Sequence, residues 1–142
     1  MELSNLIKTK KIKKIPIDKE QITNLLSLCE RDLKASEVNL KNDLLDWSFT
    51  ISYNSILQAA RALMYSYGYT PNNEDIHKTT LEFVEVVLGV KHKELIEILS
   101  MIRKKRHSAV YDEAGIVTIY EANYTLKKAK EFVKLIKEKI KF

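Results

Sequence analysis

The segment 44–67 constrains the fold more than any other part of the chain. As a helix it would carry apolar side chains around nearly its whole circumference, and it contains neither glycine nor proline. A helix of that kind is usually the buried centre of a bundle, because it has no polar face for solvent. The 142 residues include only three glycines and two prolines, which argues against a turn-rich sandwich or barrel. The sequence therefore predicts an all-α domain.

Four further segments repeat apolar residues at steps of three and four, the spacing of one helix face. Together with 44–67, they predict helices at 18–40, at 75–88, from about 91 into the stretch MIRKKRHSAVYD, and at 118–140. Expected N-caps are Asp18, Asp43 or Asp46, and Thr118, and the glycines expected to end helices are Gly68 and Gly89. Short loops between four to five helices predict an up-and-down helical bundle, and the sequence has no convincing strand pattern.

Positive charge is concentrated at the two ends of the chain. Residues 1–14 hold five lysines and one glutamate, and residues 127–142 hold seven lysines and two glutamates. The ends therefore carry +4 and +5, whereas the residues between them carry −4. We expect a basic, flexible lead-in at 1–15 and a single helical domain at 16–142. Basic ends favour an anionic partner such as RNA, and they also serve the solubility of a small domain.

Several functional classes find no support in the sequence. No apolar run approaches the roughly 20 residues of a membrane span, and the N-terminus lacks the apolar core of a signal peptide. We therefore expect a cytoplasmic protein with no membrane contact. The single cysteine, Cys29, excludes an internal disulfide framework. His77 and His92 lie near helix starts, where capping or packing roles are expected, and the histidines have no further ligands at metal-site spacing. We expect no metal and no cofactor.

Small side chains form a stripe along the predicted central helix. The stripe comprises Ser52, Ser55, Ala59, Ala62 and Ser66. Small residues let another helix approach closely, and we expect that helix to come from a second copy of the chain. The stripe and the apolar length of 44–67 therefore predict a homodimer, which would bring two basic segments into one cleft and focus their field on an anion.

The stretch MIRKKRHSAVYD, 101–112, is the strongest candidate site. It has four consecutive cations from Arg103 to Arg106, followed by His107. On a helix, Arg103, His107 and Tyr111 share one side, because each step of four residues drifts by only about 40°. Arginine can hold phosphate oxygens by two parallel hydrogen bonds, and histidine can move protons near neutral pH. The pattern suits phosphodiester binding or cleavage. The structural alternatives are cations that offset a helix dipole and a core role for Tyr111.

Three stretches of the chain resemble the HEPN superfamily of prokaryotic all-helical domains. SYNSILQAARALMYSYGYTP is similar to the family's second helix, DIHKTTLEFV to its histidine-containing third element, and MIRKKRHSAVYD to its signature helix end. The resemblance covers roughly 18–140, and it implies a four-to-five-helix up-and-down bundle that usually forms a homodimer. Active members are metal-independent ribonucleases with an arginine, four to six residues and then a histidine. Many are toxins paired with a minimal nucleotidyltransferase antitoxin.

The family signature matches this chain with one replacement. Arg106 matches the motif arginine, and Tyr111 stands five places later, where the motif histidine is expected. The signature therefore reads Arg-x4-Tyr, and a neutral phenol seldom accepts a proton near pH 7. The resemblance implies catalytic roles for Arg106 and Tyr111, and the proton chemistry of histidine adds His107 as a candidate. At the same surface we expect RNA or nucleotide binding by Arg103, Lys104, Lys105 and Asp112.

Three functions follow as hypotheses. The first is a HEPN protein of a toxin–antitoxin or related defence pair, which binds RNA or nucleotide at a basic dimer cleft and has a minimal nucleotidyltransferase as partner. The second is a metal-independent endoribonuclease that uses Arg106 and His107. The third is a non-catalytic dimeric adaptor whose helical surface binds a protein. Because Tyr111 replaces the motif histidine, we expect RNA cleavage to be absent or slow.

Overall fold

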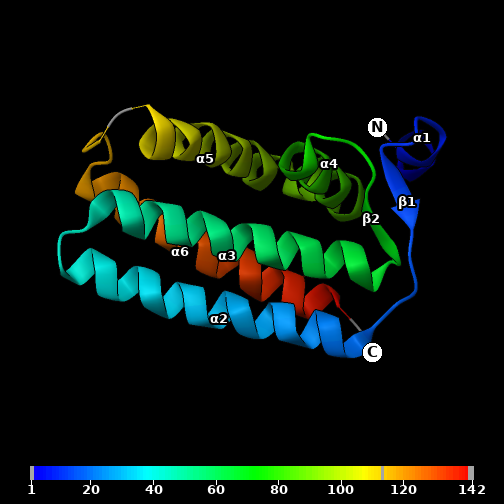
Figure 1. The fold of residues 1–142 in the computed structure, drawn as a ribbon, viewed down its shortest axis with the longest axis horizontal. Helices are drawn as coiled ribbons and strands as arrows, with labels where there is room; N and C mark the ends of the chain where they lie inside the picture. The colour runs from blue at the N-terminus through cyan, green and yellow to red at the C-terminus, as the bar shows by residue number, and fades with distance from the viewer. Residues whose placement is uncertain (1, 113, 141–142) are drawn as a thin grey trace.

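Helices dominate the computed structural model, which describes residues 2–112 and 114–140 (Figure 1). In chain order the elements are α1 (Leu3–Lys8), β1 (Ile12–Lys14), α2 (Lys19–Lys41), α3 (Leu45–Ser66), β2 (Tyr69–Pro71), α4 (Ile76–Leu88), the 3₁₀ turn η1 (Val90–His92), α5 (Lys93–Tyr111) and α6 (Ile119–Lys139). The predicted all-α helical bundle is confirmed. Each of the five predicted helices has its counterpart among α2 to α6, with ends that agree within about two residues.

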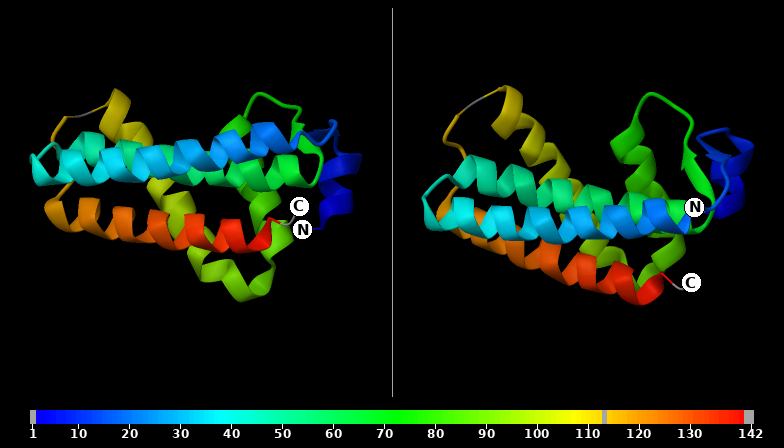
Figure 2. Two further views of the ribbon diagram at one scale, coloured as in Figure 1. Left: turned by 90° about the horizontal axis from the view of Figure 1, so that it is seen from below. Right: turned by 60° about the horizontal axis from the view of Figure 1, so that its bottom comes forward.

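The central helix of the bundle is α3. It contacts α2 and α6, which run beside it, and α4 and α5, which lie on the side away from α2 (Figures 1 and 2). Its side chains are therefore buried on most sides, and Tyr53, Ile56 and Leu63 are inaccessible to solvent. This arrangement agrees with the prediction from the apolar segment 44–67.

Two helices begin at the predicted caps. The carboxylate of Asp18 accepts hydrogen bonds from two backbone N–H groups in the first turn of α2, at 3.1 and 3.3 Å. Thr118 and Glu121 form a reciprocal capping box at the start of α6, because each side chain accepts a hydrogen bond from the other residue's backbone N–H. These caps fix where two of the three longest helices start.

The start of α3 differs from the prediction. Its N-cap is Leu44, which makes no side-chain cap, and Asp43 turns the chain with φ +59°. Asp46 accepts hydrogen bonds from the backbone N–H groups of Gly115, at 2.6 Å, and Val117, at 3.3 Å. The expected aspartate cap on this helix is therefore wrong, and Asp46 instead ties the loop between α5 and α6 to the start of α3.

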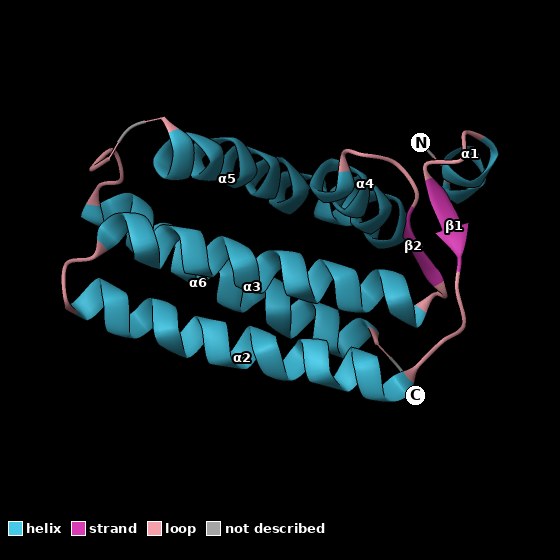
Figure 3. Ribbon diagram, in the orientation of Figure 1, coloured by secondary structure: helices cyan, strands magenta, loops and turns pink. Residues whose placement is uncertain are grey.

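Residues 3–14 also differ from the expected flexible lead-in, because they form α1 and β1. The strand β1 pairs antiparallel with β2 in a two-stranded sheet at one end of the bundle (Figure 3). Leu6 and Ile12 are buried in a cluster with Met64 and Phe83. These apolar contacts attach the segment to the bundle. A strand of three residues is too short for an alternating pattern to reveal it.

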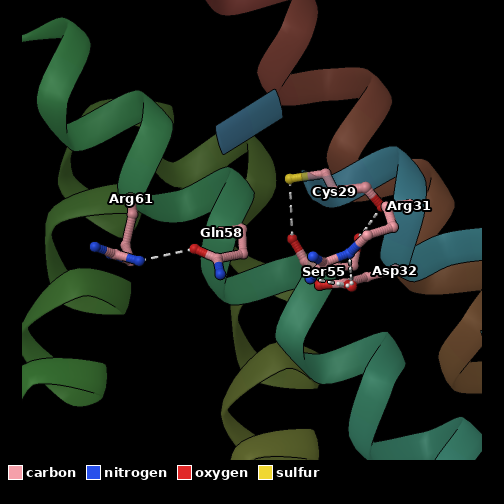
Figure 4. Close-up of polar contacts among 6 residues, drawn as sticks. All are labelled: Cys29, Arg31, Asp32, Ser55, Gln58 and Arg61. Atoms are coloured by element: carbon pink, nitrogen blue, oxygen red, sulfur yellow. Dashed lines mark hydrogen bonds and ion pairs between the residues drawn. The ribbon is translucent and has the colours of Figure 1, made fainter. Parts of the chain in front are cut away.

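The small-residue stripe of α3 faces α2 of the same chain. The hydroxyl oxygens of Ser52 and Ser36 are 2.7 Å apart, and both side chains are fully buried. Cys29 and Ser55 exchange hydrogen bonds with each other's backbone carbonyl, at 3.4 and 3.3 Å (Figure 4). Burial raises the pKa of the Cys29 thiol to about 12, so the thiol stays protonated. The interpretation of this stripe as a face for a second copy is therefore wrong.

No helix among the described residues has the length and apolar character that crossing a membrane requires. Within the same residues, no three side chains of His, Cys, Asp or Glu gather as the ligands of a metal ion would.

Candidate functional site

A tyrosine and a histidine meet where α4 lies on α3. The hydroxyl oxygen of Tyr53 is 3.2 Å from Nδ1 of His77, and the two ring centroids are 5.8 Å apart. Tyr53 is fully buried, whereas His77 is half-buried. Burial raises the pKa of Tyr53 to about 12, although the charges of Arg103 and Arg106 act in the opposite direction. The hydroxyl group therefore keeps its proton at neutral pH.

The guanidinium group of Arg106 lies against two tyrosine rings. Its Cζ is 5.7 Å from the ring centroid of Tyr53 and 6.0 Å from that of Tyr111, within the range of cation–π contacts. Its Nε is buried and has no hydrogen-bond partner among the described residues. Buried N–H donors are nearly always paired in native structures. Within the described part of the chain, the fold therefore supplies no acceptor for the Nε–H of Arg106.

Positive charge surrounds His77. Burial lowers the pKa of the His77 imidazole, and the charges of Arg106 and Arg103 lower it further. Asp75 acts in the opposite direction, and Arg61 makes the smallest contribution. No carboxylate forms an ion pair with any of these three arginines in the described part of the chain. We call Tyr53, His77, Arg103, Arg106 and Tyr111 the α4–α5 site.

Arg61 is held in place on α3. Its guanidinium donates to Oε1 of Gln58, at 2.8 Å (Figure 4). It also donates to the hydroxyl of Tyr65, at 3.2 Å. Both acceptors are neutral, so they fix the direction of the side chain, and no carboxylate of the described residues pairs with its charge. Arg61 therefore contributes to the positive field of the α4–α5 site.

His107 and Tyr111 lie together at the end of α5. Their ring centroids are 5.0 Å apart, and Tyr111 is 66% exposed. The core role weighed for Tyr111 is therefore wrong. Tyr111 contacts both Arg106 and His107, although the side chains of those two consecutive residues point about 100° apart around the helix axis. Within the described residues, no hydrogen bond or ring contact joins His107 to Arg103, the partner that helical spacing favoured.

The two lysines of the predicted site face other parts of the surface. Lys105 forms an ion pair with Glu121, at 3.2 Å, and lines with Lys104 a groove of about 760 Å³ between α5 and α6. Lys104 also borders, with Arg103, a smaller groove of about 220 Å³ between α4 and α5. Asp112 is the exposed C-cap of α5. Of the predicted residues, Arg103, Arg106 and Tyr111 therefore belong to the α4–α5 site, and Lys104 and Lys105 line the groove between α5 and α6. His107 and Asp112 are exposed and belong to neither.

Sequence reasoning missed Tyr53 and Arg61 and gave His77 a structural role. The three residues lie on two helices and contribute to a site whose other members lie on α5, so no spacing within one helix connects them. One signal was available, since Tyr53 places a hydroxyl group within a helix that is apolar nearly all round. A buried hydroxyl group needs a hydrogen-bond partner.

Comparisons with known proteins agree with this fold. Residues 22–140 match the family model described as the HEPN domain. Among solved structures, the chain is similar to the crystal structure of an archaeal HEPN homologue, with a TM-score of 0.65 and 16% sequence identity. That likeness covers 84% of this chain and 98% of the other, and at such identity it concerns the fold. No curated protein matches the sequence. Because the family model covers most of the chain, the protein belongs to the HEPN family.

Proposed function

We propose that this HEPN protein binds RNA or nucleotide through the α4–α5 site, as one component of a toxin–antitoxin or related defence pair. The observation that carries the proposed binding is the buried Nε of Arg106, which lies beside two tyrosine rings and has no hydrogen-bond partner among the described residues. A phosphate oxygen is the acceptor that suits this group best, because a guanidinium offers parallel donors to two oxygens of one phosphate.

The surroundings of Arg106 support an anionic ligand with a flat base. Three arginines lie near His77 without a carboxylate partner among the described residues, so a phosphate would neutralise charge that the protein leaves unbalanced. The exposed ring of Tyr111 is a surface on which a base can stack, and such stacking contributes about 1–3 kcal/mol per base. Both features suit single-stranded RNA or a nucleotide.

The same geometry favours binding over cleavage. Metal-free cleavage of RNA needs a group that takes the proton of the 2′-hydroxyl and another that protonates the leaving oxygen. Tyr111 stands where the family motif has its histidine, and a neutral phenol donates a hydrogen bond more readily than it accepts a proton. His107 packs on Tyr111 at the exposed end of α5. We therefore propose that RNA cleavage is absent or slow.

The proposed assembly is a homodimer in the cytoplasm, with a minimal nucleotidyltransferase as its partner protein. Support for the homodimer now comes from the groove between α5 and α6. Met101, which is 70% exposed, and Tyr124, which is 48% exposed, line that groove. Apolar side chains gathered on a surface are typical of protein interfaces, so a second copy docked there would remove them from water.

Fluorescence anisotropy with a labelled single-stranded RNA tests the proposed binding. The double variant Arg103→Ala/Arg106→Ala should bind at least about tenfold more weakly, a loss of ~1.4 kcal/mol. The matched control Lys91→Ala/Lys93→Ala removes the same charge from exposed positions before and at the start of α5 and should change affinity little. Equal losses of RNA affinity in both variants would mean that affinity depends only on the net charge of the protein, and this result would contradict the proposed site.

Circular dichroism separates binding from folding in this experiment. Both double variants should keep wild-type helicity and nearly the same melting temperature, because neither pair contributes a fully buried side chain. If the arginine variant unfolds while the lysine variant does not, the arginines are structural and the proposed site is wrong.

A further inference from the structure

His77 has a hydrogen-bond arrangement that fixes where its proton lies. Tyr53 is fully buried, and His77 Nδ1 is the only hydrogen-bond partner of its hydroxyl group in the described residues. If Nδ1 carried the proton, the hydroxyl hydrogen of Tyr53 would be buried without an acceptor, which is unfavourable. The satisfied arrangement has Tyr53 donating to Nδ1. The proton of the neutral imidazole then sits on Nε2.

The charges around His77 disfavour a second proton. Tyr53 and Arg61 come from α3, Asp75 stands at the N-cap of α4, and Arg103 and Arg106 come from α5. Burial penalises an imidazolium most, and three of these five groups are positive, so the pKa of His77 is lowered. Protonation would further require Nδ1 to become a donor toward a hydroxyl group that is already donating. His77 is therefore neutral at physiological pH.

We propose that His77 acts in the α4–α5 site as a neutral hydrogen-bond donor to a phosphate oxygen, through an Nε2–H that Tyr53 fixes. This inference rests on the proposed binding function and names the chemistry of the same site. The recognised group is a phosphate oxyanion of RNA or of a nucleotide, shared between the Nε2–H of His77 and the guanidinium of Arg106. Tyr53 is a positioning residue, because it acts through His77.

The fixed tautomer of His77 also determines what this residue can do in catalysis. In the proposed tautomer, Nδ1 accepts a hydrogen bond from the hydroxyl group of Tyr53, 3.2 Å away, and Nε2 carries the imidazole proton. Neither nitrogen is then free to take a proton from a 2′-hydroxyl group. His77 therefore binds phosphate without serving as a general base, although it is a histidine beside an arginine. A catalytic base at this position would need the opposite tautomer.

Long-range ¹H–¹⁵N spectra of the histidine rings test the tautomer in the wild-type protein. We expect His77 to give the Nε2–H pattern and to titrate below the usual histidine value of about 6.5. In Tyr53→Phe, Nδ1 loses its donor, so the two tautomers should mix and the titration should move toward that usual value. A wild-type Nδ1–H tautomer, or a His77 titration at or above the usual value, would overturn the inference. The wild-type spectrum decides this even if the Tyr53 variant does not fold.

RNA affinity tests the donor role, with both a short single-stranded RNA and a mononucleotide as probes. His77→Ala should weaken binding about tenfold, whereas His77→Gln, whose amide N–H can replace the Nε2–H donor, should retain most of the affinity. His92→Ala, which removes a histidine next to α5 outside the site, is the matched control and should bind normally. If His77→Ala loses affinity for RNA alone, the phosphate that His77 binds is a phosphodiester of the RNA chain. If it loses affinity for both probes, His77 binds the phosphate of a single nucleotide unit.

The outcomes separate this inference from the proposed function. If His77→Ala binds normally while Arg103→Ala/Arg106→Ala loses affinity, the donor role of His77 is wrong and the proposed binding site stands. If the arginine variant also binds normally, the proposed binding site itself is wrong. If His77→Gln binds as weakly as His77→Ala, an N–H donor is not what the position supplies, and the inference fails.

Discussion

The guanidinium carbon of Arg106 lies 5.7 Å from the ring centroid of Tyr53, so a charged side chain of α5 rests on a buried aromatic ring of α3. The same tyrosine bonds His77 of α4 through its hydroxyl group. Three helices therefore meet at one phenol, and the Nε of the arginine is left without a partner among the described residues. This arrangement is the structural basis for the anion binding that we propose, and it offers no free proton acceptor at Tyr53 or Arg106.

RNA binding should weaken steeply with salt. Each phosphate contact on a single strand releases counterions, and it contributes about −0.7 to the slope of log affinity against log salt concentration. Arg106→Ala should therefore make the slope less negative by about 0.7, and Lys91→Ala should leave it unchanged. Binding isotherms at several salt concentrations measure both slopes. An unchanged slope in Arg106→Ala, at reduced affinity, would mean that Arg106 does not contact phosphate.

Wild-type protein should cut RNA slowly or not at all, and addition of EDTA should make no difference. Tyr111→His restores the family's spacing after Arg106, so this variant should gain cleavage if the rest of the site is competent. Incubation of a generic RNA with each protein, followed by gel electrophoresis, measures the outcome. Efficient wild-type cleavage in EDTA that His107→Ala abolishes would favour the endoribonuclease hypothesis over ours.

Asp46→Ala should destabilise the fold without changing RNA affinity. The carboxylate accepts two backbone hydrogen bonds from the loop between α5 and α6, and hydrogen bonds to charged groups are worth about 1.5–3 kcal/mol each. We expect a loss of ~1–3 kcal/mol in the free energy of unfolding, because Asp46 is only half-buried and water replaces part of the interaction. Urea titration measures it. The control Glu97→Ala removes an exposed carboxylate and should cost little.

How far the sequence predicts this fold depends on the length of each element. Segments such as 44–67 repeat apolar residues at helical spacing over many turns, so this local pattern alone is enough to predict a helix. Ile12 belongs to a three-residue strand, and its burial depends on Phe83, which lies far along the chain. No local pattern contains that contact, so the structured N-terminus could not be predicted.

The residues of the candidate site also fall into those that a local pattern predicts and those that depend on contacts between helices. Arg103, Arg106 and Tyr111 lie on one helix. The run of cations identifies the two arginines from the sequence, and helical spacing from Arg103 identifies Tyr111. Tyr53 and His77 join them only because α3 and α4 pack against α5, and helix spacing cannot report a contact between helices. The small-residue stripe of α3 was predicted correctly in one respect and wrongly in another. Its spacing correctly indicated close helix packing, but the chain's own α2 supplies the packing partner.

Light scattering should find a dimer at micromolar concentration. Met101→Glu should give a monomer, because the proposed interface would bury a carboxylate in place of an apolar side chain that lines the groove between α5 and α6. Val90→Glu changes another exposed apolar residue, outside that groove, and should remain dimeric. A monomeric wild-type protein would contradict both the homodimer and any site shared between two subunits.

The most direct test of the account is a crystal structure of the protein with a short single-stranded RNA. We predict a phosphate oxygen about 2.7–2.9 Å from Nε of Arg106, the distance of a charge-assisted hydrogen bond, with the adjacent base on the ring of Tyr111. RNA bound only along the lysine-rich ends or in the groove between α5 and α6, with Nε of Arg106 still unpaired, would contradict the account.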